Sequence, residues 1–454
     1  MKFRHIAVLA IAGGASASAL ATNGYFSHGY GMVAKGMGGA ATAMTEDTFG
    51  GANNPASMVW VGDRMDIGLD LFSPKRQASR SGSAGMGTGM DASSPSGSNL
   101  FYIPEFGYNR MLGPDKAIGI TVYGNGGMNT DYPGGRIGPG TACDMFNANG
   151  PGSHNILCGS GRLGVNLEQL IVAPTFSMKL NDRHSVGASL LLGYQRFKAT
   201  GLSAFYGFTA SAANGLPYDT GNNVTNRGND SSIGAGLRIG WTGKVSDTLT
   251  LGAAYATRMH MGKFDKYKDL FAERGGFDLP ENWNVGLAFK PTPQMTLALD
   301  YQHISYGAIK SIANGSRTAA DAPGMPPGGA ANSLGCSSCR GFGWSSVNAV
   351  KLGVEYQYSP ALTLRAGYNH GSNPISSRDV TMNILAPGVV QDHYTLGMSY
   401  ALNNDSQLTV SYMHAASKSV KGASIFNSWL GDNATETIKM HENSLGIAYS
   451  VKFK

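Results

Sequence analysis

The sequence predicts an all-β chain, a 14-stranded antiparallel transmembrane β-barrel with an N-terminal hatch, or plug, inside the lumen. Three observations predict this fold. Apolar residues alternate with small or polar residues in 14 separate segments, charged residues make up only 14% of the chain, and Gly accounts for 64 of its 454 residues. Successive strand side chains point to opposite faces, so each segment has one apolar face and one small or polar face.

The first 21 residues have the pattern of a secretory signal peptide. Lys2 and Arg4 form a positive start, residues 6–12 form a short apolar run, and Ala19-Leu20-Ala21 is a small-residue cleavage site. This run is too short for a membrane-spanning helix. We therefore expect residues 1–21 to direct export.

The four cysteines form two local pairs, Cys143 with Cys158 and Cys336 with Cys339. An exported chain reaches an oxidising compartment, so we expect a structural disulfide in each pair. Cys336 and Cys339 also fit a redox C-x-x-C motif, but they lie in a Gly- and Pro-rich loop. A zinc site is disfavoured because two further ligands are not visible.

Residues 22–65 do not alternate, and they are too apolar for a flexible tail. We expect this segment to be the hatch. Its Ala-rich run from Met37 to Met44 predicts a short helix, which Gly38 and Gly39 would weaken. The small residues would allow close packing against the inner wall.

The barrel is predicted to span residues 66–454. Its strands are expected at 66–76, 100–112, 115–124, 166–180, 184–198, 231–243, 247–258, 281–290, 294–304, 345–358, 361–370, 391–402, 406–416 and 441–453. Short turns alternate with long loops, as in outer-membrane barrels. Closure is required because an open edge in lipid would leave backbone groups unpaired. Fourteen strands enclose more space than wall side chains fill, which leaves room for the hatch.

Four basic residues are expected on the inner face and are candidates to bind a ligand carboxylate: Arg238, Arg258, Lys351 and Arg365. The alternative is that they pair with acidic residues of the same lumen, namely Asp300, Glu355, Glu46 or Asp47. Lys and Arg are otherwise scattered and the net charge is only +6, so no nucleic-acid surface is indicated.

The loop at 259–280 is rich in Met and aromatic residues, including Phe264, Leu270 and Phe271. Such side chains form adaptable apolar surfaces. We expect either one wall of a groove that captures ligand or packing against neighbouring loops. The sequence has no G-x-S-x-G, H-E-x-x-H or P-loop motif, so neither an enzyme nor a cofactor is predicted.

Three stretches resemble the FadL family of outer-membrane transporters for long-chain fatty acids and hydrocarbons. They are Gly36-Met37-Gly38-Gly39-Ala40 with Asp47 and Asn54-Pro55-Ala56-x-Met58, then Leu279-Pro280-Glu281-x-Trp283-x-Val285-Gly286, then Leu364-Arg365-Ala366-Gly367-Tyr368 with Asn373-Pro374. The resemblance covers the whole chain after the signal peptide.

The resemblance implies a passive mechanism in the outer membrane of a Gram-negative bacterium. A hydrophobic molecule would be captured among the outer loops, enter an apolar pocket and leave sideways at a kink in the third strand, here at Gly124, Gly126 and Gly127. The hatch segment Asn54-Pro55-Ala56 would lie near that exit. Long-chain fatty acids are the expected substrates and hydrocarbons are the alternative.

The expected partners are these molecules and the surrounding outer-membrane lipid and lipopolysaccharide, with the protein as a monomer. Two other classes stay open. A general diffusion porin should have a charged lumen and a short N-terminus, and a structural or adhesive barrel would act through its long loops.

Overall fold

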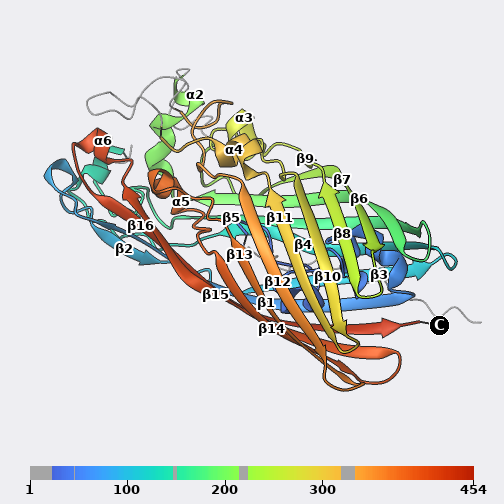
Figure 1. Ribbon diagram of the computed structural model, residues 1–454. Coiled ribbons are helices and arrows are strands. Elements are labelled where there is room, and N and C mark those ends of the chain that lie inside the picture. The colour runs from blue at the N-terminus through green and yellow to red at the C-terminus, as the bar shows by residue number, and fades with distance from the viewer. Residues whose placement is uncertain (1–22, 45, 147–150, 214–222, 318–332, 454) are drawn as a thin grey trace, which may run out of the picture.

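The computed structural model describes residues 23–44, 46–146, 151–213, 223–317 and 333–453, so the predicted signal peptide lies outside the described part. Within it, 14 long antiparallel strands form the wall of a closed barrel (Figure 1). This confirms the predicted fold. Each of the predicted strands has a counterpart in the wall.

The wall consists of β1 (Arg64–Ser81), β3 (Phe101–Met111), β4 (Lys116–Asn129), β5 (Gly164–Lys179), β6 (His184–Thr200), β7 (Asp230–Lys244), β8 (Leu249–Ala256), β10 (Asn282–Thr292), β11 (Met295–Ile304), β12 (Val347–Gln357), β13 (Leu362–Gly371), β14 (Asp392–Ala401), β15 (Ser406–Ala423) and β16 (Thr435–Lys452). Two short strands, β2 (Ala92–Pro95) and β9 (His260–Met261), pair with β1 and β7 outside this ring.

The last strand closes the barrel on the first. β16 pairs with β1 from Lys452 opposite Arg64 to Thr435 opposite Ser81. This pairing satisfies the backbone groups that an open edge would expose to lipid. On β16, Leu445, Ile447 and Tyr449 face outward and are 42–49% exposed, whereas the residues between them are buried. An apolar belt therefore surrounds the barrel.

Four strands are longer than the sequence predicts, among them β4, which was expected at 115–124 and continues to Asn129. β1, β15 and β16 were expected at 66–76, 406–416 and 441–453, and each continues for several residues at its loop end. The alternation of apolar residues stops where these strands leave the apolar belt, but backbone pairing continues. Apolar alternation in the sequence arises from contact with lipid, so it does not predict the parts of these strands that extend beyond the lipid.

The helices are short and lie in the N-terminal segment and the long loops. The α-helices are α1 (Met32–Gly36), α2 (Ala210–Ala213), α3 (Ala272–Gly275), α4 (Lys310–Ala313), α5 (Val380–Asn383) and α6 (Asn427–Leu430). The 3-10 helices are η1 (Thr48–Gly51), η2 (Pro55–Trp60), η3 (Gly85–Gly87), η4 (Ala142–Phe146), η5 (Ser203–Phe208), η6 (Asp265–Tyr267), η7 (Tyr306–Ala308) and η10 (Ser377–Asp379). None of the helices in the described ranges has the length and hydropathy needed to cross a bilayer.

Both predicted disulfides are present in the loops. Cys143 is bonded to Cys158, and Cys336 is bonded to Cys339. The first bond closes a loop between β4 and β5, and the second closes a single turn between β11 and β12. Both bonds therefore restrain connections at the long-loop end of the barrel.

Candidate functional site

Residues 23–44 and 46–63 fold inside the barrel and are called the hatch below (Figure 1). Its helix α1 packs against β14 and β15, η1 packs against β4, and η2 packs against β5, β6 and β7. Almost every hatch residue up to Val59 is buried. The segment therefore occupies the lumen that 14 strands enclose.

Charged groups of the wall anchor the hatch. The Lys35 ammonium lies 2.8 Å from the Asp70 carboxylate and 3.5 Å from that of Glu105. The Asp300 carboxylate accepts hydrogen bonds from the backbone N–H groups of Ala41 and Thr42, at 2.8 and 2.9 Å. Removing one partner of such a buried contact would leave an uncompensated polar group.

Asp47 is buried at the start of η1, where its carboxylate accepts a hydrogen bond from the Phe49 N–H at 3.0 Å. Burial raises the pKa of Asp47 from 3.8 to about 7, and the nearby charge of Asp66 contributes to the rise. Arg64 is paired with Asp66 at 2.9 Å. The hatch therefore contains one carboxyl group that titrates near neutral pH.

The glycine-rich stretch packs backbone against backbone. A Cβ atom on Gly36 would lie 3.0 Å from the Cα of Gly397 in β14, and the Gly38 N–H donates to the Thr395 hydroxyl at 2.9 Å. The predicted helix over residues 37–44 is wrong, because α1 ends at Gly36. Gly38 and Gly39 have φ angles of +66° and +86°, which end the helix.

The third wall strand, β4, contains a bulge. Its register against β5 shifts between Gly124 and Gly126, so Asn125 is the extra residue. The pairing of β3 with β4 stops at Phe106 and Val122. Both strands are described in full, and beyond this point β3 pairs only with β1, and β4 only with β5. At the glycine-rich end of β4, therefore, β3 and β4 form no backbone hydrogen bonds with each other.

The hatch replaces β3 as the backbone partner of the bulge. The Gly127 N–H donates to the Tyr25 carbonyl at 3.2 Å, and the Ser27 N–H donates to the Asn125 carbonyl at 3.3 Å. The Tyr30 hydroxyl donates to the same carbonyl at 3.0 Å. The backbone groups of β4 that do not pair with β3 therefore form hydrogen bonds with the hatch inside the lumen.

The segment Asn54-Pro55-Ala56 lies elsewhere. The Asn54 amide donates to the Trp241 carbonyl of β7 at 3.0 Å, and the Pro55 carbonyl lies beside Gly187 of β6. Gly187 is at the short-turn end of β6, far along the wall from the bulge. The prediction that this segment adjoins Gly124, Gly126 and Gly127 is wrong, because residues 25–30 occupy that place.

The four predicted cations all contact groups of the same chain. Arg238 contacts the carbonyl oxygen of Ala52, Arg258 is paired with Asp278 at 2.7 Å, Lys351 donates to the His28 carbonyl at 2.9 Å, and Arg365 is paired with Glu355 at 2.7 Å and with Glu46 at 3.3 Å. Only Arg365 pairs with two of the acidic residues named in the alternative, whereas Arg238 and Lys351 contact backbone carbonyls and Arg258 pairs with an acidic residue that was not named.

The aromatic loop packs inward. Phe264, Leu270 and Phe271 are at most 4% exposed, so they form no open groove, and the alternative of packing on neighbouring elements fits their positions. The Phe271 ring lies 4.6 Å from that of Phe197 and 5.0 Å from that of Phe277.

This cluster continues to the hatch. The ring of Phe277 lies 6.1 Å from that of Tyr25, which lies 4.9 Å from that of Tyr306, and Tyr306 is 5.4 Å from Trp344. A continuous row of aromatic side chains therefore runs from the loops to the hatch residue that covers the bulge.

Three buried arginines on the inner face of β1, Arg64, Arg76 and Arg80, are not among the predicted candidates. Arg76 of β1 is 4% exposed and lines a small cavity together with apolar residues that include Met128, Trp344 and Met440. Among the described residues, its Nε atom has no hydrogen-bond partner. The guanidinium carbon lies 5.7 Å from the centre of the Phe101 ring. Alternation places Arg76 on the inner face of β1, but Arg76 is the last residue of the predicted strand 66–76.

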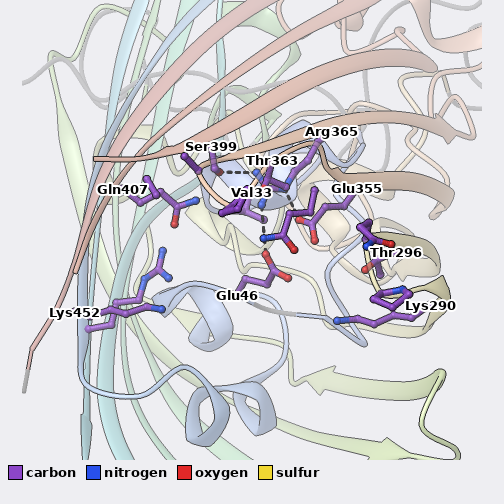
Figure 2. Close-up of a pocket in the computed structure, with 17 residues that line it drawn as sticks. Val33, Glu46, Lys290, Thr296, Glu355, Thr363, Arg365, Ser399, Gln407 and Lys452 are labelled. Atoms are coloured by element: carbon purple, nitrogen blue, oxygen red, sulfur yellow. Dashed lines mark hydrogen bonds and ion pairs between the residues drawn. The ribbon is translucent and has the colours of Figure 1, made fainter. Parts of the chain in front are cut away.

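A second cavity, of about 410 Å³, lies on the short-turn side of the hatch (Figure 2). Its lining is mostly polar and includes Glu46, Lys290, Glu355, Arg365 and Lys452. Figure 2 shows Arg365 at the centre of an ion-pair and hydrogen-bond cluster at its edge. An apolar molecule would gain no burial in this space.

Residues 8–453 match the family model of the outer membrane protein transport proteins (OMPP1/FadL/TodX). Among curated protein sequences, none matches the chain.

Similar solved structures include the P. putida toluene transporter TodX, at 18% identity and a TM-score of 0.66, covering 94% of this chain and 99% of that one. The Ralstonia pickettii toluene transporter TbuX has 18% identity, a TM-score of 0.63 and the same coverage. A Pseudomonas aeruginosa FadL homologue has 13% identity and a TM-score of 0.63, covering 95% and 100%.

Proposed function

Because the chain belongs to the outer membrane protein transport family (OMPP1/FadL/TodX), we propose that it admits hydrophobic molecules through a lateral opening between β3 and β4. Family members are outer-membrane β-barrels of Gram-negative bacteria that transport hydrocarbons or fatty acids, and they are channels rather than enzymes. The chain is therefore an outer-membrane transporter. Its route and its substrate are the proposal.

The observation that carries the route is the exchange of backbone partners at the β4 bulge. β3 leaves this part of β4 unpaired, and hatch residues 25–27 satisfy it instead. A lateral opening in a barrel wall is costly unless the exposed backbone groups find partners. The hatch supplies them, and a small movement of residues 25–27 would uncover the opening.

Two further features support a sideways route. The aromatic row from Phe271 to Tyr25 connects the loops to the bulge through apolar side chains, and these buried rings would have to separate to admit a molecule. The opposite route would lead into the polar cavity beside Glu46 and Arg365, where an apolar molecule would displace water from charged groups.

A pair of engineered disulfides tests the route. Ser27→Cys with Asn125→Cys would join the hatch to the bulge, where the two backbones share a hydrogen bond of 3.3 Å. Ala56→Cys with Ser185→Cys, where the Ser185 hydroxyl donates to the Ala56 carbonyl at 2.8 Å, joins the hatch to β6 and is the matched control. We expect uptake of labelled toluene to be lost in the first variant and restored by reductant, and to be retained in the second.

Wild-type protein treated with the same reductant controls for the native disulfides. Equal uptake by both oxidised variants would contradict a lateral exit at β4.

For the substrate, we propose a neutral hydrocarbon of the size of a single aromatic ring. Arg238, Arg258, Lys351 and Arg365 are all engaged with the chain itself, so none is set aside for a carboxylate. The row of rings suits an aromatic ligand. Two of the similar structures are transporters of toluene, which is such a molecule.

Arg76 favours the second candidate, a long-chain fatty acid. Its unpaired Nε at an apolar cavity could hold a carboxylate whose chain lies against Met128 and Met440. Arg76→Met distinguishes the two, with Arg64→Met, a buried arginine paired with Asp66 at 2.9 Å, as the control. If the ligand is a hydrocarbon, toluene uptake is unchanged in Arg76→Met and oleate does not bind the wild type. Oleate binding that Arg76→Met weakens about tenfold would establish the fatty acid instead.

A further inference from the structure

The outward faces of β1, β15 and β16 change character along their length. On paired strands, Leu69 lies opposite Ile447 and Leu71 opposite Leu445, so this level belongs to the apolar belt. The next outward positions are polar or basic, beginning at Ser73. Because the long loops follow this end, the change marks the headgroup level of the outer leaflet.

Five side chains at this level can carry positive charge, and we call them the basic patch: Lys75, His414, Lys421, Lys439 and His441. Lys75 stands directly opposite His441 in the β1–β16 pair, and Lys439 is the next outward residue of β16. Directly opposed residues have Cβ atoms only about 5 Å apart. His441 is close enough to His414, Lys439 and Lys75 to experience the charge of all three.

In the part of the chain that the structure describes, no carboxylate is paired with the lysines of the patch. The two acidic residues of β16 nearest to the patch, Glu436 and Glu442, are fully buried on the inner face. Among the ion pairs between described residues, none includes Lys75, Lys421 or Lys439. Like charges this close repel, and an anion lying against these exposed lysines would relieve that repulsion.

Neighbouring sectors of the wall lack this charge. Toward β11 and β12, His303 bonds the Asn348 side chain at 2.7 Å, and toward β13 and β14, His370 is paired with Asp392 at 2.7 Å. These groups carry no unbalanced charge, and His414 of the basic patch likewise bonds the Asn443 side chain, at 3.0 Å, so the charge of the patch rests on its three lysines. Unbalanced positive charge at this level is therefore found on the β1–β16–β15 sector and not on these residues of β11 to β14.

We propose that the basic patch binds the phosphate-bearing headgroup of an outer-leaflet glycolipid, the lipopolysaccharide of the outer membrane. The apolar belt directly below it would contact the acyl chains, and the lysines would contact phosphate at the headgroup level. Neither a soluble anion nor the transported substrate would contact the apolar belt and the basic patch at the same time. The inference holds whichever molecule the channel transports.

The test uses the full chain in detergent and measures retention of bisphosphorylated lipid A by native mass spectrometry. Lys75→Gln with Lys439→Gln removes two charges from the patch. Lys198→Gln with Lys263→Gln removes two exposed charges elsewhere at the loop end and is the matched control. We expect the first double variant to bind lipid A about tenfold more weakly and the control to bind as the wild type does.

Dephosphorylated lipid A should bind the wild type as weakly as bisphosphorylated lipid A binds the Lys75/Lys439 variant, and added salt should weaken only the phosphorylated ligand. Equal binding by the two double variants, or by the two lipids, would overturn the proposal. Inorganic phosphate that competes at the same concentration would assign the patch to a free anion instead. The wild-type salt and lipid comparisons need no variant, so they stand even if a variant folds poorly.

Discussion

The two sides of the hatch are attached to the barrel by different chemistry. Toward β4, residues 25–30 make backbone hydrogen bonds and aromatic contacts at a bulge. Toward β12 and β13, Arg365 holds Glu46 of the hatch and Glu355 of the wall at the edge of a polar cavity. One side therefore depends on exchangeable backbone bonds, and the other on an ion-pair cluster in which the wall pair Arg365–Glu355 is largely buried and the hatch residue Glu46 is 40% exposed.

This difference suggests how the hatch can open a path at β4 while it stays inside the barrel. A single backbone hydrogen bond contributes about 1 kcal/mol, because water or another strand can replace the partner. Breaking a buried ion pair costs about 3–5 kcal/mol. We therefore expect the hatch to move first at β4 while the Arg365 cluster keeps it in place.

The largest effect should come from removing both attachments. Deleting residues 23–60 takes away the hatch and leaves the wall strands intact. Since 14 strands enclose more space than wall side chains fill, the lumen should become a water-filled pore. Single-channel conductance in planar bilayers should rise on the order of tenfold or more, relative to the wild type. A folded deletion variant with unchanged conductance would show that the hatch does not close the lumen.

Arg365→Met should break the ion-pair side alone. It leaves Glu355 and Glu46 without their cation and also removes a hydrogen bond to Ser399 at 2.6 Å. We expect the free energy of unfolding to fall by about 3 kcal/mol, measured by urea titration in detergent, with toluene uptake by the folded protein retained. Lys290→Gln, an exposed residue of the same cavity, is the control and should change neither quantity.

Loss of uptake in Arg365→Met, at equal amounts of folded protein, would mean that both sides of the hatch take part in transport.

Tyr306→Phe should loosen the β4 side. The Tyr306 hydroxyl donates to the Asn23 carbonyl at 2.7 Å and accepts from the N–H groups of Tyr25 and Phe26 at 3.1 Å. Losing it should cost about 1–2 kcal/mol locally, so the amides of Tyr25 and Phe26 should exchange hydrogen roughly tenfold faster. Tyr301→Phe, which removes an outward hydroxyl bonded to Asn348, should leave these amides unchanged.

Unchanged exchange in Tyr306→Phe would show that the aromatic row, rather than this hydroxyl, fixes the hatch segment.

The sequence carries enough information to predict the wall, because lipid imposes the same alternation on every strand. Leu445, Ile447 and Tyr449 show it at the C-terminus, and they face outward as expected. Beyond the lipid-facing part of a strand the apolar alternation stops, so the sequence did not predict the extension of β1 past residue 76. Local chemistry also predicted both disulfides.

The site was harder to predict because its contacts join residues far apart in sequence. The bulge near Gly124 and Gly126 follows from local glycine content, but its partner Tyr25 does not. Arg365 was assigned to the lumen correctly, yet alternation cannot say whether Glu355 or a ligand neutralises it. Alternation along a strand predicts whether a side chain points into the lumen. Its contact partners there depend on how the hatch folds, which alternation does not predict.

The smallest effect should be a pH dependence of the hatch on its β4 side, due to Asp47. Burial raises the pKa of this carboxyl to about 7 in the folded state, whereas in an unfolded chain it would be near 3.8. The folded state therefore binds more protons between these values, and its stability falls as pH rises through that window. From pH 6 to pH 8 the free energy of local unfolding around η1 should drop by about 1 kcal/mol.

Hydrogen exchange of the Phe49 amide, corrected for intrinsic rates, measures this quantity. Asp47→Asn should abolish the slope, because an amide does not titrate, while Asp115→Asn on an exposed turn should keep it. A slope of the opposite sign would mean that the charge of Arg64 outweighs burial and the charge of Asp66 at this carboxyl. The hatch would then be held by ions on both sides, and the contrast between its two attachments would disappear.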